Sequence, residues 1–489
     1  MALSAEQIAS FLDSAAKAAE NIRQIVKEDG LIHVFSHLDA DGVAAGGIIG
    51  KALYRLDAKF RIQVTQWINE KIADEIQSEK PQLLVFTDLG SGYLDFITCN
   101  LPDCHAVILD HHQIIGKETG NITQVNPRLH GIDGARDVSG AGVAYFVAKA
   151  IDPINIDLAP IAVIGALGDL QDKYDQRRLC GINERIVEDA VNADCLSVEK
   201  DLIFFGRETR PIHKMLSSTT NPFIPGLSGD EASSVSFLKN NGIEPKIDEK
   251  WRALRDLSEE EKKRLCSALA DYLLSKGLHY EVTNLIGHVY TLKKEEPWTP
   301  LRDAREFAVL LNATGRMDRP SLGVAVCMGD RQTALEEANK ILEEYRRNIN
   351  KYLGWVMEKP ERMKEIENIY VVCGENFIND KIIGAISSIL TSSLPNPEKP
   401  LIAYANVEEE GVAKFSARTM DVMIDRGINL AAVMQIAAEK FKGKGGGHDV
   451  AAGAQVPIDS VNAFIEIVND LVGKQLRGEK IGSQNNTSV

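Results

Sequence analysis

The sequence lacks long apolar runs, is poor in cysteine and has no excess of positive charge. No stretch of 18 or more apolar residues occurs in the 489 residues, which excludes a membrane-spanning helix. The seven cysteines form no CxxC pair, which argues against a zinc ribbon or a disulfide framework and favours a reducing compartment. The net charge of −15 excludes a histone-like coating of nucleic acid but allows one local basic groove. Residues 1–28 lack the pattern of a signal peptide, so we expect a soluble, cytoplasmic protein.

Length and composition predict about three domains at roughly 150 residues each. Apolar residues make up 44% and charged residues 26%, which is typical of a folded globular chain. The pattern of apolar runs, helical periodicity and Pro/Gly/Ser-rich stretches divides the chain into five parts. These are a first α/β domain at 1–204, an inserted unit at 205–300, a linker region with a long bridging helix at 301–360, a smaller α/β domain at 361–476, and a polar, disordered tail at 477–489.

Polar side chains follow the buried strands predicted in the first domain. Three short apolar runs end in LDADG (38–42), TDLG (87–90) and DHH (110–112), and a fourth, predicted to be helical, ends in GDLQD (168–172). In an open parallel sheet the site forms beyond the carboxyl ends of the strands. We therefore expect these acidic and histidine side chains to gather at one edge of the sheet.

The side chains at this edge suit divalent metals. His37, Asp39 and Asp41 alternate, which predicts that they share one side of an extended segment leaving a strand. Imidazole and carboxylate ligands without thiolate favour Mn²⁺ or Mg²⁺. With Asp88, His111 and Asp169 they supply enough ligands for two ions bridged by one carboxylate, and two ions about 3.5–4 Å apart activate water for phosphoryl displacement. Each motif alone is more often a capping loop or solvated edge, but four in succession are an improbable coincidence.

The second α/β domain carries a candidate anion-binding site. Consecutive glycines, Gly445, Gly446 and Gly447, allow backbone N–H groups to approach an anion closely, and His448, Lys442 and Lys444 add positive charge. Arg418, on the preceding predicted strand, can grip a phosphate with two hydrogen bonds. The alternative is that the glycines form a flexible loop before a strand.

These motifs together resemble the DHH phosphoesterase superfamily. SHLDADG (36–42), TDLG (87–90), DHH (110–112) and GALGDLQD (165–172) match its four motifs in order and spacing, while FSART (415–419) and GGGHDVAAG (445–453) resemble those of the DHHA1 domain. LNATGRM (311–317) with the following long helix is similar to the linker region of RecJ-type nucleases, and the insert is similar to that of archaeal RecJ-like nucleases, relatives of a eukaryotic replicative-helicase subunit. The resemblance implies a parallel-sheet α/β fold with a helical insert, a long bridging helix and a smaller DHHA1 domain, with the active-site cleft between the two.

The resemblance also implies a role for each motif residue. One metal would be held by His37, Asp39 and Asp88, and a second by Asp41, Asp88, His111 and Asp169, with Mn²⁺ preferred over Mg²⁺. His112 would act beside the scissile phosphate and Asp110 would orient a histidine. The substrate would be bound by Arg316, Ser416, Arg418, Gly445, Gly446, Gly447 and His448.

Three functions remain open at this point. The first is an exonuclease on single-stranded DNA or RNA in replication or repair, and the second is a phosphodiesterase of cyclic dinucleotides or very short oligonucleotides. The third is a scaffold in a replication complex, in which residues 205–300 bind a GINS-type factor and hydrolysis is secondary. The intact ligand set argues against a purely structural role. The polarity of digestion and the preference for DNA or RNA cannot be inferred from these residues.

Overall fold

The computed structural model describes residues 3–118, 120–174, 176–219, 224–391, 394 and 396–481, without the side chain of Tyr280. The described residues divide into two compact units: the first comprises the residues up to Thr219 and Pro225–Glu343, and the second comprises Ile224 and the residues from Glu344 onward. Most of the tail predicted at 477–489, and part of the Pro- and Gly-rich stretch after Thr219, lie outside the described residues. None of the described helices is both long and apolar enough to cross a membrane.

A parallel sheet forms the centre of the first unit, as predicted. Its described strands run in the order β2-β1-β3-β4-β5, and each pairs with its neighbour in parallel. Their bounds are β1 Leu31–His37, β2 Lys59–Thr65, β3 Leu83–Thr87, β4 Ala106–Leu109 and β5 Ile122–Val125. β3 and β4 are buried along their full length, because helices cover both faces of a parallel sheet. The carboxyl ends of all these strands therefore meet at one edge.

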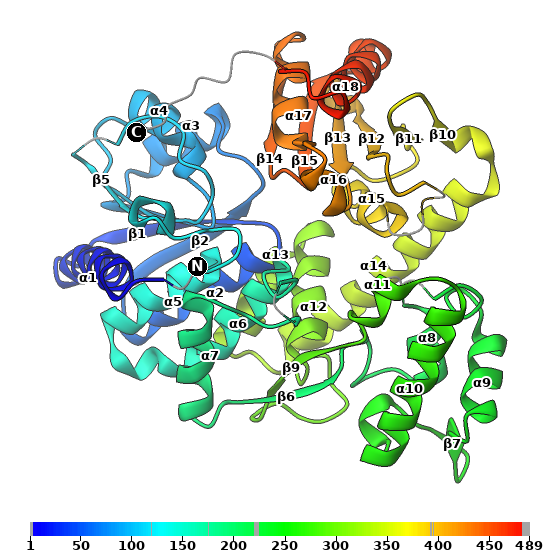
Figure 1. Ribbon diagram of the computed structural model, residues 1–489. Helices are drawn as coiled ribbons and strands as arrows, with labels where there is room; N and C mark the ends of the chain where they lie inside the picture. The colour runs from blue at the N-terminus through cyan, green and yellow to red at the C-terminus, as the bar shows by residue number, and fades with distance from the viewer. Residues whose placement is uncertain are drawn as a thin grey trace. The chain divides into compact units, whose positions relative to one another are not determined.

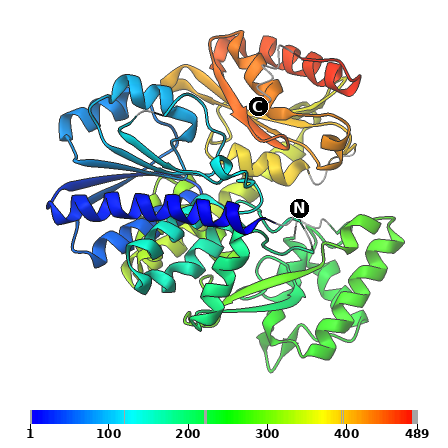
Figure 2. The same ribbon diagram turned by 60° about the vertical axis from the view of Figure 1, so that its left-hand side comes forward.

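Helices pack on both faces of this sheet (Figure 1). The apolar side chains of α3 and α4 join those of β1, β3 and β4 in one buried cluster. On the opposite face α1 lies along α5 and β5, and α2 packs between α5 and α6 (Figure 2). A capping box at Ser4 fixes the start of α1. The helices of this part of the chain are α1 Ala5–Lys27, α2 Ala40–Arg55, α3 Glu70–Glu79, α4 Leu94–Asn100, α5 Gly140–Ile151, α6 Ala159–Gly168 and α7 Ile182–Asn192.

The insert is framed by two antiparallel strands that sequence patterning did not predict. β6 (Leu196–Leu202) pairs with β9 (Ile286–Leu292), and Leu202 lies opposite Ile286. The segment between them therefore leaves and returns at adjacent points of the first unit. It consists of α8 Ile212–Ser217, α9 Glu231–Asn240, β7 Lys246–Ile247, β8 Lys250–Trp251, α10 Glu259–Ser275 and α11 His279–Val282. Three helices follow it, α12 Ala304–Arg316, α13 Pro320–Met328 and the predicted long helix α14 Thr333–Glu358.

The second unit is built on a mixed sheet with the order β10-β11-β12-β13-β15-β14. Helices α17 and α18 share a buried apolar cluster with its strands, and α15 contacts β12 and β13. The elements are β10 Met363–Glu365, β11 Tyr370–Cys373, α15 Ile383–Thr391, β12 Leu401–Val407, β13 Val412–Arg418, α16 Val422–Asp425, α17 Leu430–Glu439, β14 Lys444–Gly447, β15 Ala451–Pro457 and α18 Val461–Leu476. The expected loop at 442–453 is instead the β14–β15 hairpin.

Candidate metal centre

The first acidic motif lies where β1 passes into α2. β1 ends at His37, and Asp39 caps α2 by accepting the Gly42 N–H at 3.0 Å. The expected extended segment is therefore wrong, because an N-cap aspartate starts the helix at once and puts Asp41 in its first turn. The carboxylate of Asp41 accepts the N–H groups of Gly140 and Ala141 at 2.6 and 3.0 Å, at the start of α5. These two hydrogen bonds hold the Asp41 carboxylate at the N-terminus of α5, where the helix dipole favours a negative charge.

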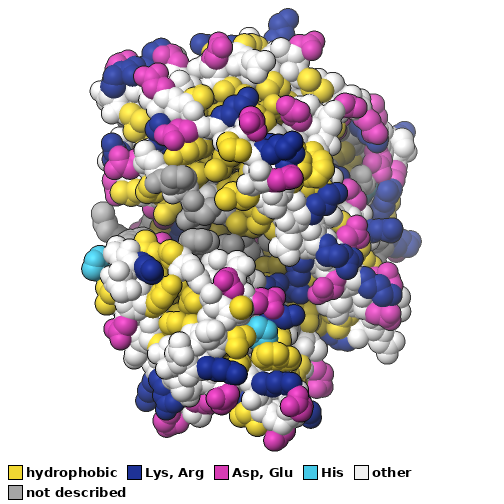
Figure 3. Space-filling view, turned by 90° about the vertical axis from the view of Figure 1, so that its right-hand side faces the viewer, with side chains coloured by type: hydrophobic (Ala, Val, Ile, Leu, Met, Phe, Trp, Pro, Cys, Tyr) yellow, Lys and Arg dark blue, Asp and Glu magenta, His cyan; other side chains and the backbone are white. Residues whose placement is uncertain are grey.

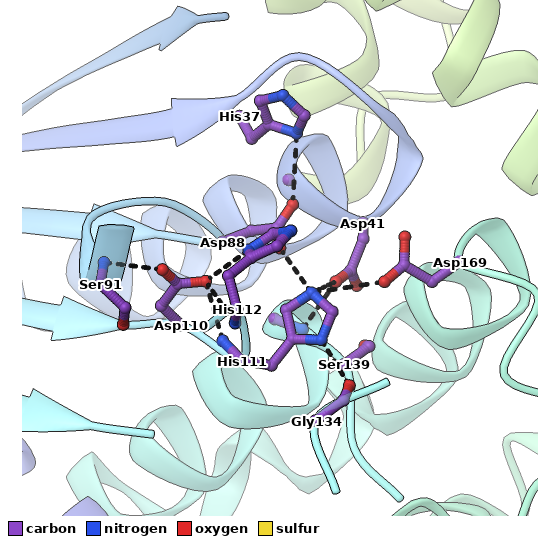
Figure 4. Close-up of polar contacts among 12 residues, drawn as sticks. His37, Asp41, Asp88, Ser91, Asp110, His111, His112, Gly134, Ser139 and Asp169 are labelled. Carbon is purple, nitrogen blue, oxygen red and sulfur yellow. Dashed lines mark hydrogen bonds and ion pairs between the residues drawn. The ribbon is translucent and has the colours of Figure 1, made fainter. Parts of the chain in front are cut away.

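Asp88 lies at the centre of the cluster, immediately after β3 (Figure 4). Its backbone adopts the left-handed region, with φ at 55°, and the residue is 1% exposed. Among the described residues, no group with hydrogen-bond geometry reaches either carboxylate oxygen. The nearest ring nitrogens are Nε2 of His111, 3.1 Å from Oδ1, and Nδ1 of His37, 3.6 Å from Oδ2. A Cβ at Gly140 would lie 2.5 Å from Oδ1, so the glycine makes room for this carboxylate.

His111 directs one ring nitrogen into the same cluster. Its Nδ1 lies 2.6 Å from the carbonyl oxygen of Gly134, so Nδ1 carries the proton and donates it. Nε2 lies 3.1 Å from Asp88, 3.3 Å from Asp169 and 3.7 Å from Asp41. Nε2 has no partner with hydrogen-bond geometry among the described residues. A buried ring nitrogen held in this way and surrounded by carboxylates is typical of a metal ligand.

Asp110 holds His112 and the backbone of the DHH motif. Its Oδ1 lies 2.8 Å from Nδ1 of His112 and accepts the N–H of His111, while Oδ2 accepts the N–H of Ser91. The His112 side chain is 40% exposed, in contrast to the buried ring of His111. The carboxylate of Asp110 therefore orients the ring of His112 through Nδ1.

The charges of the cluster are unbalanced without a cation. Burial and the charge of Asp88 raise the pKa of Asp41 to about 7, and burial with the charge of Asp41 raises the pKa of Asp169 well above its usual range. Burial works against a charged imidazole, yet Asp39 and Asp88 raise the pKa of His37 well above normal. The carboxylates around His111 do the same to its pKa. The surroundings of Asp41, Asp169, His37 and His111 thus favour added positive charge, which is what a divalent cation supplies.

Three groups of ligand atoms are close enough to hold an ion, and one of them joins Asp88 to Asp110, His111 and His112. The atoms of His37, Asp39 and Asp88 lie within 4.8 Å of one another, and so do those of Asp41, His111 and Asp169. Hard oxygen and nitrogen donors, with orphaned buried atoms on Asp88, His37 and His111, fit divalent Mn²⁺ or Mg²⁺. The structure therefore brings together all six residues that the sequence predicted as ligands.

Helix α12 supports this centre, and Arg316 lies at its C-terminal end. The side-chain oxygen of Asn312 accepts the N–H of Ala40 at 3.0 Å, inside the first acidic motif. Burial opposes ionisation of Asp39, but His37 and the nearby charge of Arg316 contribute to a pKa well below normal. Arg316 thus lies beside the cluster, where a substrate phosphate would meet it.

Sequence reasoning missed the supporting residues of the centre. Gln171 donates to the Gly134 carbonyl that also holds His111, and Asn126 donates to the carbonyl of His112. Gln171 lies within the fourth motif, GALGDLQD, and this was the only feature of the sequence that pointed to a role for Gln171 at the site. Asn126 follows β5, a strand that the apolar pattern did not mark.

The predicted substrate residues of the second unit lie at one end of its sheet. Arg418 ends β13 and pairs in register with Ala451, beside the turn that His448 begins. Its guanidinium donates to Ser388 at 3.0 Å and to the Ala417 carbonyl, and Ser416 is buried against Ser387.

The glycine run has a packing reason of its own. Gly445, Gly446 and Gly447 lie in β14, the last strand of the sheet, and not in an open loop. A Cβ at Gly445 would lie 2.3 Å from the carbonyl oxygen of Met434 in α17. Helix α17 can therefore approach β14 closely because this position has no side chain.

Family models and relatives agree with this geometry. The DHH-CID domain model matches residues 204–286, and the DHHA1 domain model matches residues 367–474. An uncharacterized protein of Methanocaldococcus jannaschii is 34% identical over 473 residues, covering 94% of this chain and 99% of that protein. The single-stranded-DNA-specific exonuclease RecJ of Bacillus subtilis is 25% identical over 173 residues, 33% of this chain and 22% of the exonuclease. The chain belongs to the RecJ-like DHH/DHHA1 family.

Solved structures show the same fold. RecJ from Thermus thermophilus with Mn²⁺ has a TM-score of 0.57 at 16% identity, covering 94% of this chain and 55% of that one. CDC45 from Entamoeba histolytica has a TM-score of 0.64 at 12% identity, covering 94% of this chain and 99% of that one. The RecJ-like fold is thus shared with proteins whose structures contain manganese and with CDC45.

Proposed function

We propose that this RecJ-like DHH protein is a two-metal phosphodiesterase that degrades single-stranded DNA or RNA to mononucleotides, in replication or repair. The observation that carries the proposal is the complete ligand set around Asp88, with its buried oxygens lacking hydrogen-bond partners among the described residues. A protein that used this fold only as a scaffold would have no need to keep six such groups together. The match to the exonuclease RecJ supports the same reaction class.

The chain would divide the work of hydrolysis among its own residues. His37, Asp39 and Asp88 would hold one divalent ion, and Asp41, Asp88, His111 and Asp169 a second, with Mn²⁺ preferred over Mg²⁺. Bound ions of this kind activate water and stabilise phosphate oxygens. His112, oriented by Asp110, would donate from Nε2 to the phosphate or carry a proton to the leaving oxygen. Arg316 would neutralise substrate charge beside Asp39.

Products from labelled strands test the proposal. The full chain would be incubated with Mn²⁺ and a 5′- or 3′-labelled DNA or RNA single strand, with a duplex and a cyclic dinucleotide in parallel. We expect mononucleotides from a single strand and an intact duplex. Hydrolysis of the cyclic dinucleotide alone would favour the small-substrate phosphodiesterase. No hydrolysis of any substrate would favour the scaffold, for which the likeness to CDC45 is the supporting observation.

Arg418 should anchor a substrate phosphate apart from the metal centre. Arg418→Ala should weaken single-strand binding by roughly ten- to a hundredfold, because a charge-assisted bidentate contact is lost. Arg418→Lys should recover only part of it, since the ammonium keeps the charge without the fork. Binding is measured by fluorescence anisotropy, with Arg426→Ala, an exposed arginine of the same unit, as the matched control. Normal binding by Arg418→Ala, or a parallel loss of metal, would give Arg418 a role in folding instead.

The insert should dock a protein partner, which we propose is a GINS-type replication factor. The exposed Ile247 and Trp251 of its small β7–β8 hairpin, 49% and 46% exposed, provide an apolar contact. On the face shown in Figure 3, charged side chains of both signs are interspersed with hydrophobic ones.

Removal of the insert tests the docking. Because Leu202 and Ile286 are paired neighbours, a short glycine linker can join them in place of residues 203–285. The buried Glu306, which accepts from Glu208 and Thr209 of the insert, is changed to Leu in the same variant. We expect loss of co-elution with the purified factor and unchanged Mn²⁺ binding. The double variant Ile247→Asp, Trp251→Ala keeps the insert and should also fail to bind the factor. If the deletion variant and the double variant both still bind the factor, the proposal is contradicted.

A further inference from the structure

Large apolar side chains are exposed in three segments that adjoin the acidic cluster. Trp67 follows β2, Ile115 follows the DHH motif, and Leu170 directly follows Asp169. Their exposed fractions are 47%, 59% and 57%. Single exposed apolar residues are common on any surface. Here they are found on segments that also carry, or directly flank, candidate ligands.

The register of the sheet places Trp67 next to His37. Thr65, the last residue of β2, pairs with His37, the last residue of β1. Trp67 comes two residues later, so it leaves the same carboxyl edge on the side of β1 away from β3. Adjacent strands are about 4.8 Å apart and two residues span at most about 7 Å, which places the Trp67 backbone within roughly 12 Å of His37.

The backbone around Trp67 is held on both sides. The hydroxyl of Thr65 donates to the Trp67 carbonyl at 2.9 Å. Ile68 is 1% exposed and belongs to the apolar cluster beneath α3, and Asn69 caps that helix by accepting the Ile72 N–H. An exposed indole on a fixed backbone loses little freedom when a planar ligand stacks on it.

The other two side chains lie toward the opposite flank. The Ile115 N–H donates to the carbonyl of Ser91, which fixes the segment after His112. Leu170 adopts the left-handed region with φ at 55°, a costly conformation for a bulky residue, directly after Asp169. Backbone strain of this kind persists where the surroundings impose it, and here it accompanies a candidate ligand.

We propose that Trp67 is a base-stacking residue that positions the nucleotide adjoining the metal centre. The inference rests on the proposed function, since it requires a substrate with nucleobases. Phosphates are attracted to the metals and to Arg316, whereas a base needs a flat apolar surface. The exposed indole of Trp67, on a backbone within roughly 12 Å of His37, offers that surface, and stacking of this kind does not depend on which base is bound.

Kinetics of a Trp67 variant series provide the test. For the full chain with Mn²⁺ and a single strand, Trp67→Ala should raise KM by roughly 5- to 150-fold and leave kcat within about threefold. Trp67→Phe should keep KM within about threefold of the wild type, because a ring is retained. Trp298→Ala, at a similarly exposed tryptophan to which no binding role is given, is the matched control and should leave KM unchanged.

Abasic substrates identify the stacked nucleotide. One nucleotide at a time is replaced by an abasic residue, and the wild type should show a KM increase at one position near the cleaved bond. In Trp67→Ala an abasic residue at that position should no longer raise KM, because the substitution has already removed the stacking interaction. In the absence of turnover, with chelator present, single-strand binding should quench tryptophan fluorescence in the wild type and clearly less in Trp67→Phe.

Two results would overturn the inference. One is an unchanged KM in Trp67→Ala, and the other is an abasic position that stays equally sensitive in that variant. Either would leave the nuclease activity of the wild type in place. If the wild type degrades no single strand, the proposed function itself fails, so the two failures are distinguishable.

Discussion

Asp88→Asn should abolish hydrolysis while the fold remains intact. Asp88 belongs to the group with His37 and Asp39, and its Oδ1 lies 3.1 Å from Nε2 of His111 in the group that contains Asp41. Its loss should therefore disturb both metals and lower kcat on the order of a thousandfold or more. The substitution keeps the volume of the side chain and removes no hydrogen bond with good geometry among the described residues. It also relieves repulsion between the carboxylates of Asp88 and Asp41. Activity and thermal unfolding in chelator measure the two effects.

The control for this variant is Asp157→Asn. Asp157 is a partly exposed carboxylate paired with Arg55, on the chain segment before α6 and not among the ligand groups. The Asp157→Asn substitution should leave kcat unchanged, and it should change the stability of the fold little because a surface ion pair contributes little to it. In chelator, the melting temperature of Asp88→Asn should equal or exceed that of the wild type. A lower melting temperature, or near-normal hydrolysis, would contradict the role given to Asp88.

His112→Ala should lower kcat by about 10²- to 10⁴-fold and leave metal binding unchanged. The ring is held by Asp110 at 2.8 Å and is more exposed than His111, as expected of a group that meets the substrate. Loss of a positioned proton donor accounts for an effect of this size. Turnover is measured at saturating Mn²⁺, and metal affinity by calorimetry.

His105→Ala is the control for His112. His105 is exposed and immediately precedes β4, the strand whose other end carries the DHH motif. It should have no effect on turnover. Because His112 also lies near Asp88 and Asp110, a variant that loses Mn²⁺ together with activity would identify His112 as a ligand rather than a proton donor.

Most of the first domain could be predicted because its strands are buried on both faces. β1, β3 and β4 are short apolar runs that end in conspicuous polar residues, so both the strands and the site edge could be recognised. β2 was missed because, on the edge of the sheet, it alternates with charged residues. β6 and β9 were missed because residue separation alone does not show that two distant segments pair.

The ligand residues were predicted, but their local geometry was not. Alternation in HxDxD indicated an extended segment, whereas the capping preference of Asp39 begins a helix there. The glycines of β14 suggested a loop because glycine disfavours strands, whereas the close packing of α17 explains Gly445 in a strand. Gln171 and Asn126 donate to carbonyl groups of other chain segments, and a local sequence pattern does not show such long-range contacts.

Anomalous diffraction from crystals of the full chain with Mn²⁺ tests the central claim most directly. The account predicts two manganese peaks in the first unit, one bordered by His37, Asp39 and Asp88 and one by Asp41, Asp88, His111 and Asp169. Asp88→Asn crystals should lose at least one of them. Manganese absent from these residues at saturating concentration, or bound elsewhere while hydrolysis proceeds, would contradict it.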